Sequence, residues 1–164
     1  MANRAVSNKR QDDLILAVVG KFIPAFAPNA TVLYRRDQNE ELVGVDAEAF
    51  GDLGISDLNS DRMPDVIIHH AAKNQLILID TVPGHGPINA RRHDELTRSF
   101  TEARPYLILI TAFLNRREAA KHLSEISWAT DVWSADAETH LIHFNGERFL
   151  GPYEDTEGYS HHAE

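Results

Sequence analysis

Two acidic residues, Asp65 and Asp80, stand where they could do chemistry together. Each lies at the outer end of a short apolar run rich in Val and Ile, at 65–70 and 75–82. Such runs, bounded by proline or turn residues, predict β-strands, and the short stretch 71–74 predicts the turn that joins them into a hairpin. If the turn is symmetric about its midpoint, Asp65 lies directly opposite Asp80.

This pairing has an electrostatic consequence. Directly opposed residues of an antiparallel pair carry Cβ atoms roughly 5 Å apart, and like charges there are destabilising. Two carboxylates so close repel and shift each other's pKa unless a cation lies between them. Hard carboxylate oxygens favour Mg²⁺ as that cation. The sequence therefore predicts a Mg²⁺ site held by Asp65 and Asp80.

The elements around this hairpin follow from the other apolar patterns. The stretch 106–112 is apolar almost throughout, which predicts an interior strand covered on both faces. A chain that combines a hairpin with a helix-connected interior strand predicts an α/β fold, a mixed β-sheet flanked by helices. The remaining patterns predict helices at 11–22, 46–53, 89–103 and 115–126, and strands at 31–36, 131–135 and 140–145.

Smaller features refine these elements. Asn89 is a good N-cap for the helix that follows it. The polar residues 1–10 predict a frayed start, and Pro24 predicts that the chain leaves its first helix after Phe22. Leu16 and Leu123 are expected to face inward.

Length and composition predict one globular domain over 1–164, with a core at about 11–153 and a loose acidic tail at 154–164. Apolar residues make up 43% and charged residues 25% of the chain. The absence of cysteine excludes disulfides, thiolate zinc sites and a cysteine nucleophile. With no long apolar run and no signal-peptide core, the expectation is a cytoplasmic protein without a membrane partner. The net charge of −9 argues against a generic nucleic-acid binder, though local arginine clusters could still bind DNA.

The spacing around the two acids resembles a nuclease signature. Pro64-Asp65 is followed, after fourteen residues, by Asp80-Thr81-Val82, as in the PD-(D/E)XK nuclease superfamily. In that superfamily the two acids hold catalytic metal on a hairpin within a helix-flanked sheet. The superfamily's lysine belongs two residues after the second acid, where this chain has Val82. Lys73 does not replace it, because seven strand residues at ~3.3 Å each separate it from the acid by about 23 Å.

Six segments carry a closer resemblance: VLYRRD (32–37), MPDVII (63–68), LILIDTVPGHGPINARRHDEL (76–96), ITAF (110–113), ISWATDVW (126–133) and HLIHFNGERFLGPY (140–153). In the same order, they resemble the C-terminal catalytic domain of the BsuBI/PstI type II restriction endonucleases. The resemblance implies a PD-(D/E)XK restriction-endonuclease-like core. It also implies a Mg²⁺-dependent endodeoxyribonuclease that cuts double-stranded DNA at a short palindromic site, usually as a homodimer.

The chain departs from the family in three respects. The family's N-terminal domain, about as long as this chain, has no counterpart here. The second acid is usually Glu where this chain has Asp80, and the following helix usually carries Lys-Arg where this chain has Arg91-Arg92.

Roles for individual residues follow from the resemblance. Asp65, Asp80 and the Thr81 carbonyl would bind Mg²⁺, which polarises the phosphate and activates water. Arg91 or Arg92 would stabilise the charge of the transition state. Arg91 is preferred because it stands where the family has Lys, and the alternative is two solvated arginines in a surface turn.

His85 and Asp37 have less defined roles. His85 lies between glycines in the loop 83–87, where it could bond the scissile phosphate or pass a proton. A histidine that stiffens the loop or contacts DNA without a chemical role is an equal alternative. Asp37 could serve as an outer metal ligand, although capping of a turn is favoured.

Two further groups are interpreted as structural. Trp128 and Trp133 are predicted to pack in the core. Arg116, Arg117, Lys121 and His122 form either a solvated helix face, which is favoured, or a set of phosphate contacts.

Two other functions remain open at this point. A catalytically inactive relative could bind DNA or protein without cutting, as the missing lysine and the missing N-terminal domain suggest. A nuclease of the same fold could also work in DNA repair or phage defence on branched or modified DNA. Metal-dependent nicking of plasmid separates the first from an active enzyme, and branched substrates separate the second.

Overall fold

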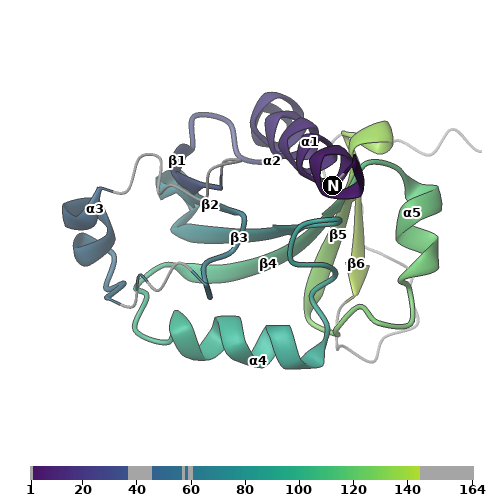
Figure 1. The fold of residues 1–164 in the computed structure, drawn as a ribbon. Coiled ribbons are helices and arrows are strands. Elements are labelled where there is room, and N and C mark those ends of the chain that lie inside the picture. Colours follow the sequence, from purple (N-terminus) through teal and green to yellow (C-terminus); the bar gives the residue numbers. More distant parts are fainter. Residues whose placement is uncertain (1, 37–45, 57, 59–60, 145–164) are drawn as a thin grey trace, which may run out of the picture.

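A single mixed sheet of six strands organises the computed structural model, which describes residues 2–36, 46–56, 58 and 61–144 (Figure 1). The strands lie in the order of the sequence: β1 (Thr31–Arg35), β2 (Val66–His70), β3 (Gln75–Thr81), β4 (Tyr106–Phe113), β5 (Thr130–Ser134) and β6 (Leu141–Phe144). The helices are α1 (Ala2–Ala17), α2 (Ile23–Phe26), α3 (Ala47–Asp52), α4 (Ala90–Ser99) and α5 (Arg116–Lys121). The predicted fold class, a mixed sheet flanked by helices, is confirmed.

The hairpin of β2 and β3 has the predicted register. Ile67 lies opposite Leu78, and the pairing ends with His70 opposite Gln75. The turn is a short 3₁₀ helix, Ala71–Lys73, closed by Asn74 in the left-handed conformation at φ 52°, which asparagine tolerates. The two acids stand one step beyond the pair of Val66 and Ile79, at the same end of the hairpin.

The centre of the sheet is parallel. β3 pairs with β4 and β4 with β5 in parallel, so α4 and α5 are the crossover helices. The strand predicted to lie in the interior, β4, does so. Asn89 caps α4 as predicted, because its side chain accepts a hydrogen bond from the Arg92 N–H at 2.9 Å. α4 ends at Ser99 and not at residue 103.

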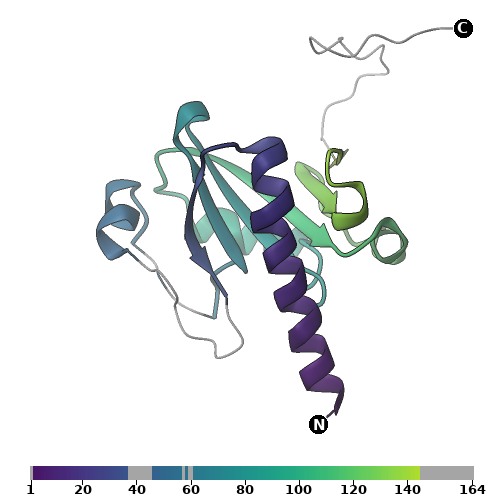
Figure 2. The same ribbon diagram turned by 90° about the horizontal axis from the view of Figure 1, so that it is seen from above.

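The two faces of the sheet are covered from opposite sides. Figure 1 and Figure 2 show α1 across one face and α4 along the other. Leu14 and Val18 pack on the α1 side with Ile79, whereas Leu96 and Leu78 lie in the α4 cluster. Because alternate residues of a strand face opposite sides, β3 supplies both cores.

The first helix departs from expectation. It begins at Ala2, so the predicted frayed start is wrong. It continues through a π-helical turn, Val18–Phe22, into α2, so the predicted exit after residue 22 is also wrong. Within that turn the Ile23 N–H bonds to the Val18 carbonyl. Pro24 then falls in the first turn of α2, where proline's missing N–H is tolerated.

Three side chains expected inside lie outside. Leu16 is 57% exposed and Leu123 56% exposed. Trp128 is 69% exposed, whereas Trp133 is fully buried as predicted. α5 ends at Lys121, so the residues after it no longer follow a helical stripe.

Among the residues that the structure describes, no helix has the length and apolar character needed to cross a membrane. Asp37 and the predicted tail at 154–164 lie outside the described residues.

Candidate metal centre

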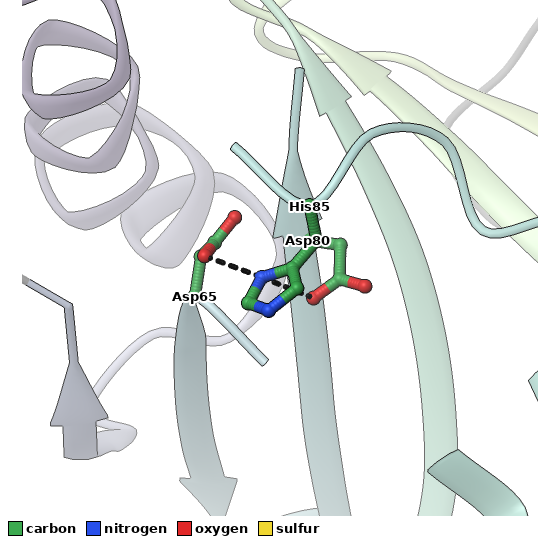
Figure 3. A group of neighbouring side chains, drawn as sticks. All are labelled: Asp65, Asp80 and His85. Carbon is green, nitrogen blue, oxygen red and sulfur yellow. Dashed lines mark hydrogen bonds and ion pairs between the residues drawn. The ribbon is translucent and has the colours of Figure 1, made fainter. Parts of the chain in front are cut away.

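Asp65, Asp80 and His85 meet at the end of the β2–β3 hairpin (Figure 3). Asp65 immediately precedes β2, Asp80 is the penultimate residue of β3, and both are fully buried. His85 comes from the loop between β3 and α4, and its side chain is 23% exposed. One potential ligand atom from each residue lies within 4.8 Å of the other two.

The Asp65 carboxylate is surrounded by donors. Its Oδ2 accepts hydrogen bonds from the Thr81 N–H at 2.8 Å and the Thr81 hydroxyl at 2.7 Å. Its Oδ1 accepts from Arg36 Nε at 3.1 Å and Gln11 Nε2 at 3.3 Å, and it lies 2.8 Å from His85 Nδ1. Burial raises the pKa of Asp65, but the hydrogen bonds from His85 and Thr81 and the His85 charge outweigh it, so the pKa lies below its ordinary value.

The Asp80 carboxylate is held by one arginine. Arg92 Nε donates to Oδ2 at 2.6 Å and Nη2 donates to Oδ1 at 3.2 Å, a bidentate pair. Burial raises the pKa of Asp80 above its ordinary value and the charge of Asp65 adds to this, while Arg92 opposes both. Arg92 is itself buried, and its third nitrogen, Nη1, donates to Glu95 at 3.1 Å and to the Arg62 carbonyl at 3.2 Å.

Arg92, and not Arg91, is therefore the arginine that contacts the acid pair. Arg91 is exposed and forms no hydrogen bond or ion pair with either acid. Adjacent helical residues point about 100° apart, so only one of the two can face the sheet. The preference for Arg91, which came from the alignment of its position with the family's Lys, gives way to Arg92.

The two residues that follow Asp80 in the sequence, Thr81 and Val82, make contacts of their own. The Thr81 carbonyl, the expected third metal ligand, accepts the Gly86 N–H at 3.3 Å. Val82 packs against the apolar cluster that contains Phe113. In the described part of the chain, no lysine forms a hydrogen bond or ion pair with Asp65 or Asp80.

Sequence reasoning missed Gln11 and Arg36, both of which contact Asp65. A signal for Arg36 lies in the pairing of β1 with β2, where Arg35 stands opposite Val66 and the Arg36 N–H donates to the Asp65 carbonyl at 2.8 Å. A bulge in β1 shifts that register, and bulges leave little trace in a sequence.

The loop after β3 closes over the first acid at Gly84. A Cβ on this residue would lie 2.5 Å from Gln11 Nε2 and from Thr81 Oγ1, and closer still to Asp65 Oδ2. Only glycine lets the backbone approach so closely.

The donor set fits a divalent cation. Two carboxylates and an imidazole are common metal ligands. Arg36 and Arg92 already contribute positive charge to the two acids, so it is the type and the convergence of the ligand atoms that suits an ion. Mg²⁺–oxygen distances of 2.0–2.1 Å place neighbouring ligands roughly 3–4 Å apart. The candidate ligand atoms lie within 4.8 Å of one another, a slightly wider separation than this. Small side-chain shifts would bring them onto one ion.

Comparisons with known proteins identify the family of the chain. The family model described as the BsuBI/PstI restriction endonuclease domain matches residues 2–147. The chain is 43% identical over 142 residues to the type II restriction enzyme BsuBI of Bacillus subtilis, covering 87% of this chain and 45% of that protein. It is 31% identical over 108 residues to the type II restriction enzyme AplI of Arthrospira platensis, covering 66% of this chain and 31% of that protein.

A solved structure, that of the SdaI restriction endonuclease, superposes with a TM-score of 0.79 at 36% identity. The match covers 88% of this chain and 46% of the SdaI chain. The chain thus spans less than half the length of the relatives it matches. On the family match and these identities, the chain belongs to the BsuBI/PstI restriction endonuclease family.

Proposed function

We propose that the chain is a Mg²⁺-dependent endodeoxyribonuclease that hydrolyses phosphodiester bonds in double-stranded DNA, like a type II restriction enzyme. One observation carries the proposal: two buried carboxylates converge with a histidine at the end of the central hairpin. The type II restriction enzymes among its relatives support the same reaction.

The two acids would bind the metal. Asp65 and Asp80 would each supply a carboxylate oxygen, and the Thr81 carbonyl would supply a third ligand oxygen. When bound, the metal polarises the phosphate and lowers the pKa of the attacking water. Hydrogen bonds from Thr81, Gln11 and Arg36 keep the Asp65 carboxylate fixed in place. This limits the reorganisation of the site that is needed during the reaction.

Arg92 and His85 would have separate roles. Arg92 bonds Asp80 through two nitrogens and Glu95 through the third, so it would supply the positive charge of the superfamily's lysine from behind the acid, without contacting the phosphate itself. His85 is oriented through Nδ1 by Asp65. In the described part of the chain its Nε2 has no hydrogen-bond partner, so this atom would bond the scissile phosphate or carry a proton.

Partners and setting follow from the same proposal. A palindromic DNA site is read most simply by two identical subunits related by a twofold axis, so the active form would be a homodimer. The protein would act in the cytoplasm, as one domain over 1–164 with a core at about 11–153.

Cleavage of supercoiled plasmid tests the proposal. The wild-type protein should nick and linearise plasmid in the presence of Mg²⁺, and this cleavage should stop when EDTA removes the metal. Asp65→Asn and Asp80→Asn should each lose about 10³-fold in rate, because several kcal/mol of metal-derived stabilisation is removed and each 1.36 kcal/mol is tenfold.

Asp13→Asn, at an exposed residue of α1, is the matched control and should cut normally. Cleavage that persists in EDTA, or full activity in either site variant, would contradict the mechanism. No cleavage by folded wild type would favour an inactive binding relative, and cleavage of branched DNA alone would favour a repair or defence enzyme.

A further inference from the structure

A charged cleft of about 490 Å³ lies between residues of α4 and Arg62 (Figure 1 shows this helix). Small-molecule pockets are lined mainly by apolar side chains. This cleft is lined by charged and polar residues: Arg62, Arg91, Asp94, Glu95, Arg98 and Ser99. Its chemistry is therefore suited to a charged ligand.

Three guanidinium groups in this cleft are uncompensated. Arg62, Arg91 and Arg98 are exposed, and within the described residues none of their guanidinium groups forms an ion pair or hydrogen bond. The two acids of the cleft have other near neighbours. Glu95 accepts from Arg92 at 3.1 Å, and Asp94 lies 3.7 Å from His93 Nδ1. With three arginines against two acids in its lining, the cleft carries one excess positive charge.

Two basic residues at the end of the α5 segment have acidic partners. Lys121 pairs with Glu118 at 2.9 Å, and His122 Nδ1 lies 2.6 Å from Glu125 Oε2. Arg116 and Arg117 are exposed and, among the described residues, form no ion pair, so they serve as a pair of equal charge away from the cleft.

The cleft is joined to the acid pair through one side chain. The Arg92 guanidinium bonds Asp80 through two nitrogens and the cleft residues Glu95 and Arg62 through the third. Arg91 and Arg98 stand seven residues apart on one face of α4, separated by roughly 10 Å along its axis. A ligand lying along this face would therefore run from the turn of α4 that carries Arg92, the partner of Asp80, toward the C-terminal end of the helix.

We propose that this arginine cleft binds backbone phosphates of duplex DNA next to the phosphate at the acid pair. The inference rests on the proposed nuclease function. Guanidinium groups bind phosphate oxygens in a bidentate manner. A local cationic surface also explains how a chain of net charge −9 could approach DNA.

Binding of a short fluorescent duplex in EDTA, from about 50 to 200 mM salt, tests the cleft without requiring cleavage. Arg91→Gln/Arg98→Gln should weaken binding roughly tenfold at the lowest salt. The slope of the logarithm of the association constant against the logarithm of the salt concentration should become less negative by about 1.8, because each of the two phosphate contacts contributes roughly 0.9 to it. Arg116→Gln/Arg117→Gln removes the same charge from α5 and should leave both quantities unchanged. Arg91→Lys/Arg98→Lys should keep the slope while losing part of the affinity.

Equal losses in the α4 and α5 pairs would show a general charge effect and overturn the proposal. Unchanged binding by Arg91→Gln/Arg98→Gln, or no duplex binding by wild type at the lowest salt, would also overturn it. Inorganic phosphate at the same ionic strength should compete no better than chloride, and strong competition would identify a free-phosphate site instead. Because the assay contains no metal, a failure of cleavage in the plasmid assay leaves this result interpretable.

Discussion

Arg92 links three parts of the molecule through a single guanidinium group. It is almost fully buried and forms a bidentate pair with Asp80, while its remaining nitrogen bonds Glu95 and the Arg62 carbonyl. Burial lowers the pKa of Arg92, but Asp80 and Glu95 outweigh it and raise the pKa above its ordinary value. Arg92 is therefore the fixed countercharge of a carboxylate that has no access to solvent.

Removal of this countercharge should be costly. We expect Arg92→Gln to lower the free energy of unfolding by about 3–5 kcal/mol in EDTA, because it leaves the Asp80 carboxylate buried without a charged partner. Urea denaturation measures the effect. The loss should be smaller with Mg²⁺ present, since a bound ion would supply the missing positive charge.

Arg91→Gln is the matched control, because it alters the neighbouring residue of the same helical turn. Arg91 is exposed and unpaired within the described chain, so its replacement should change stability by less than about 0.5 kcal/mol. Similar losses in the two variants would refute a specific role for the Arg92–Asp80 pair.

At the scale of elements, the loop between β3 and α4 brings three features to one place. It carries His85 to the acids, places Gly84 over Asp65, and leads into the helix that carries Arg92. Its backbone is held at both ends, since the Gly86 N–H donates to the Thr81 carbonyl and Asn89 caps α4.

We predict that Gly84→Ala disturbs the site from its backbone side. The added Cβ would collide with Asp65, Thr81 and Gln11, and overpacking of this kind costs typically 1–3 kcal/mol. Urea denaturation should show that loss, and plasmid cleavage should fall because Asp65 is displaced. Gly51→Ala, where an added Cβ meets nothing within 4 Å, should be neutral or stabilise α3 by up to about 1 kcal/mol. Normal cleavage by Gly84→Ala would show that the close approach is unimportant.

The elements that were predictable from the sequence depend on local patterns. The Val- and Ile-rich runs indicate β2 and β3, a symmetric turn gives their register, and Asn89 marks the start of α4. The π-helical turn before Pro24 was not predictable, because it depends on how the first helix crosses the sheet.

The residues that reach the site from distant elements could not be predicted from the sequence either. Gln11 and Arg36 lie 54 and 29 residues from Asp65, and no local periodicity links them to it. The choice between Arg91 and Arg92 required the rotation of α4 about its axis, which its packing on the sheet determines. Trp128 was assigned to the core by residue type, yet it lies outside because the chain there has already left α5.

At the scale of the whole molecule, metal binding should be linked to folding. The acids come from separate strands and meet only in the folded chain, so an ion held by both stabilises the native state. At a hundredfold excess of Mg²⁺ over its Kd the stabilisation should reach about 2.7 kcal/mol. Thermal unfolding should show a higher Tm with MgCl₂ than with NaCl at equal ionic strength.

Asp80→Asn should abolish this Mg²⁺-dependent rise in Tm, whereas Asp13→Asn should retain it. A rise of equal size in all three proteins would indicate binding elsewhere on the acidic surface, and an ion site at the hairpin would then be excluded.

The most direct test is diffraction from crystals of the protein soaked in Mn²⁺, measured at a wavelength where Mn²⁺ scatters anomalously. We predict one anomalous peak at coordination distance from a carboxylate oxygen of Asp65 and one of Asp80. Two results would contradict a metal site held by both acids. One is an absence of anomalous density there at saturating Mn²⁺, and the other is an ion that contacts only one acid while Arg92 remains bonded to Asp80.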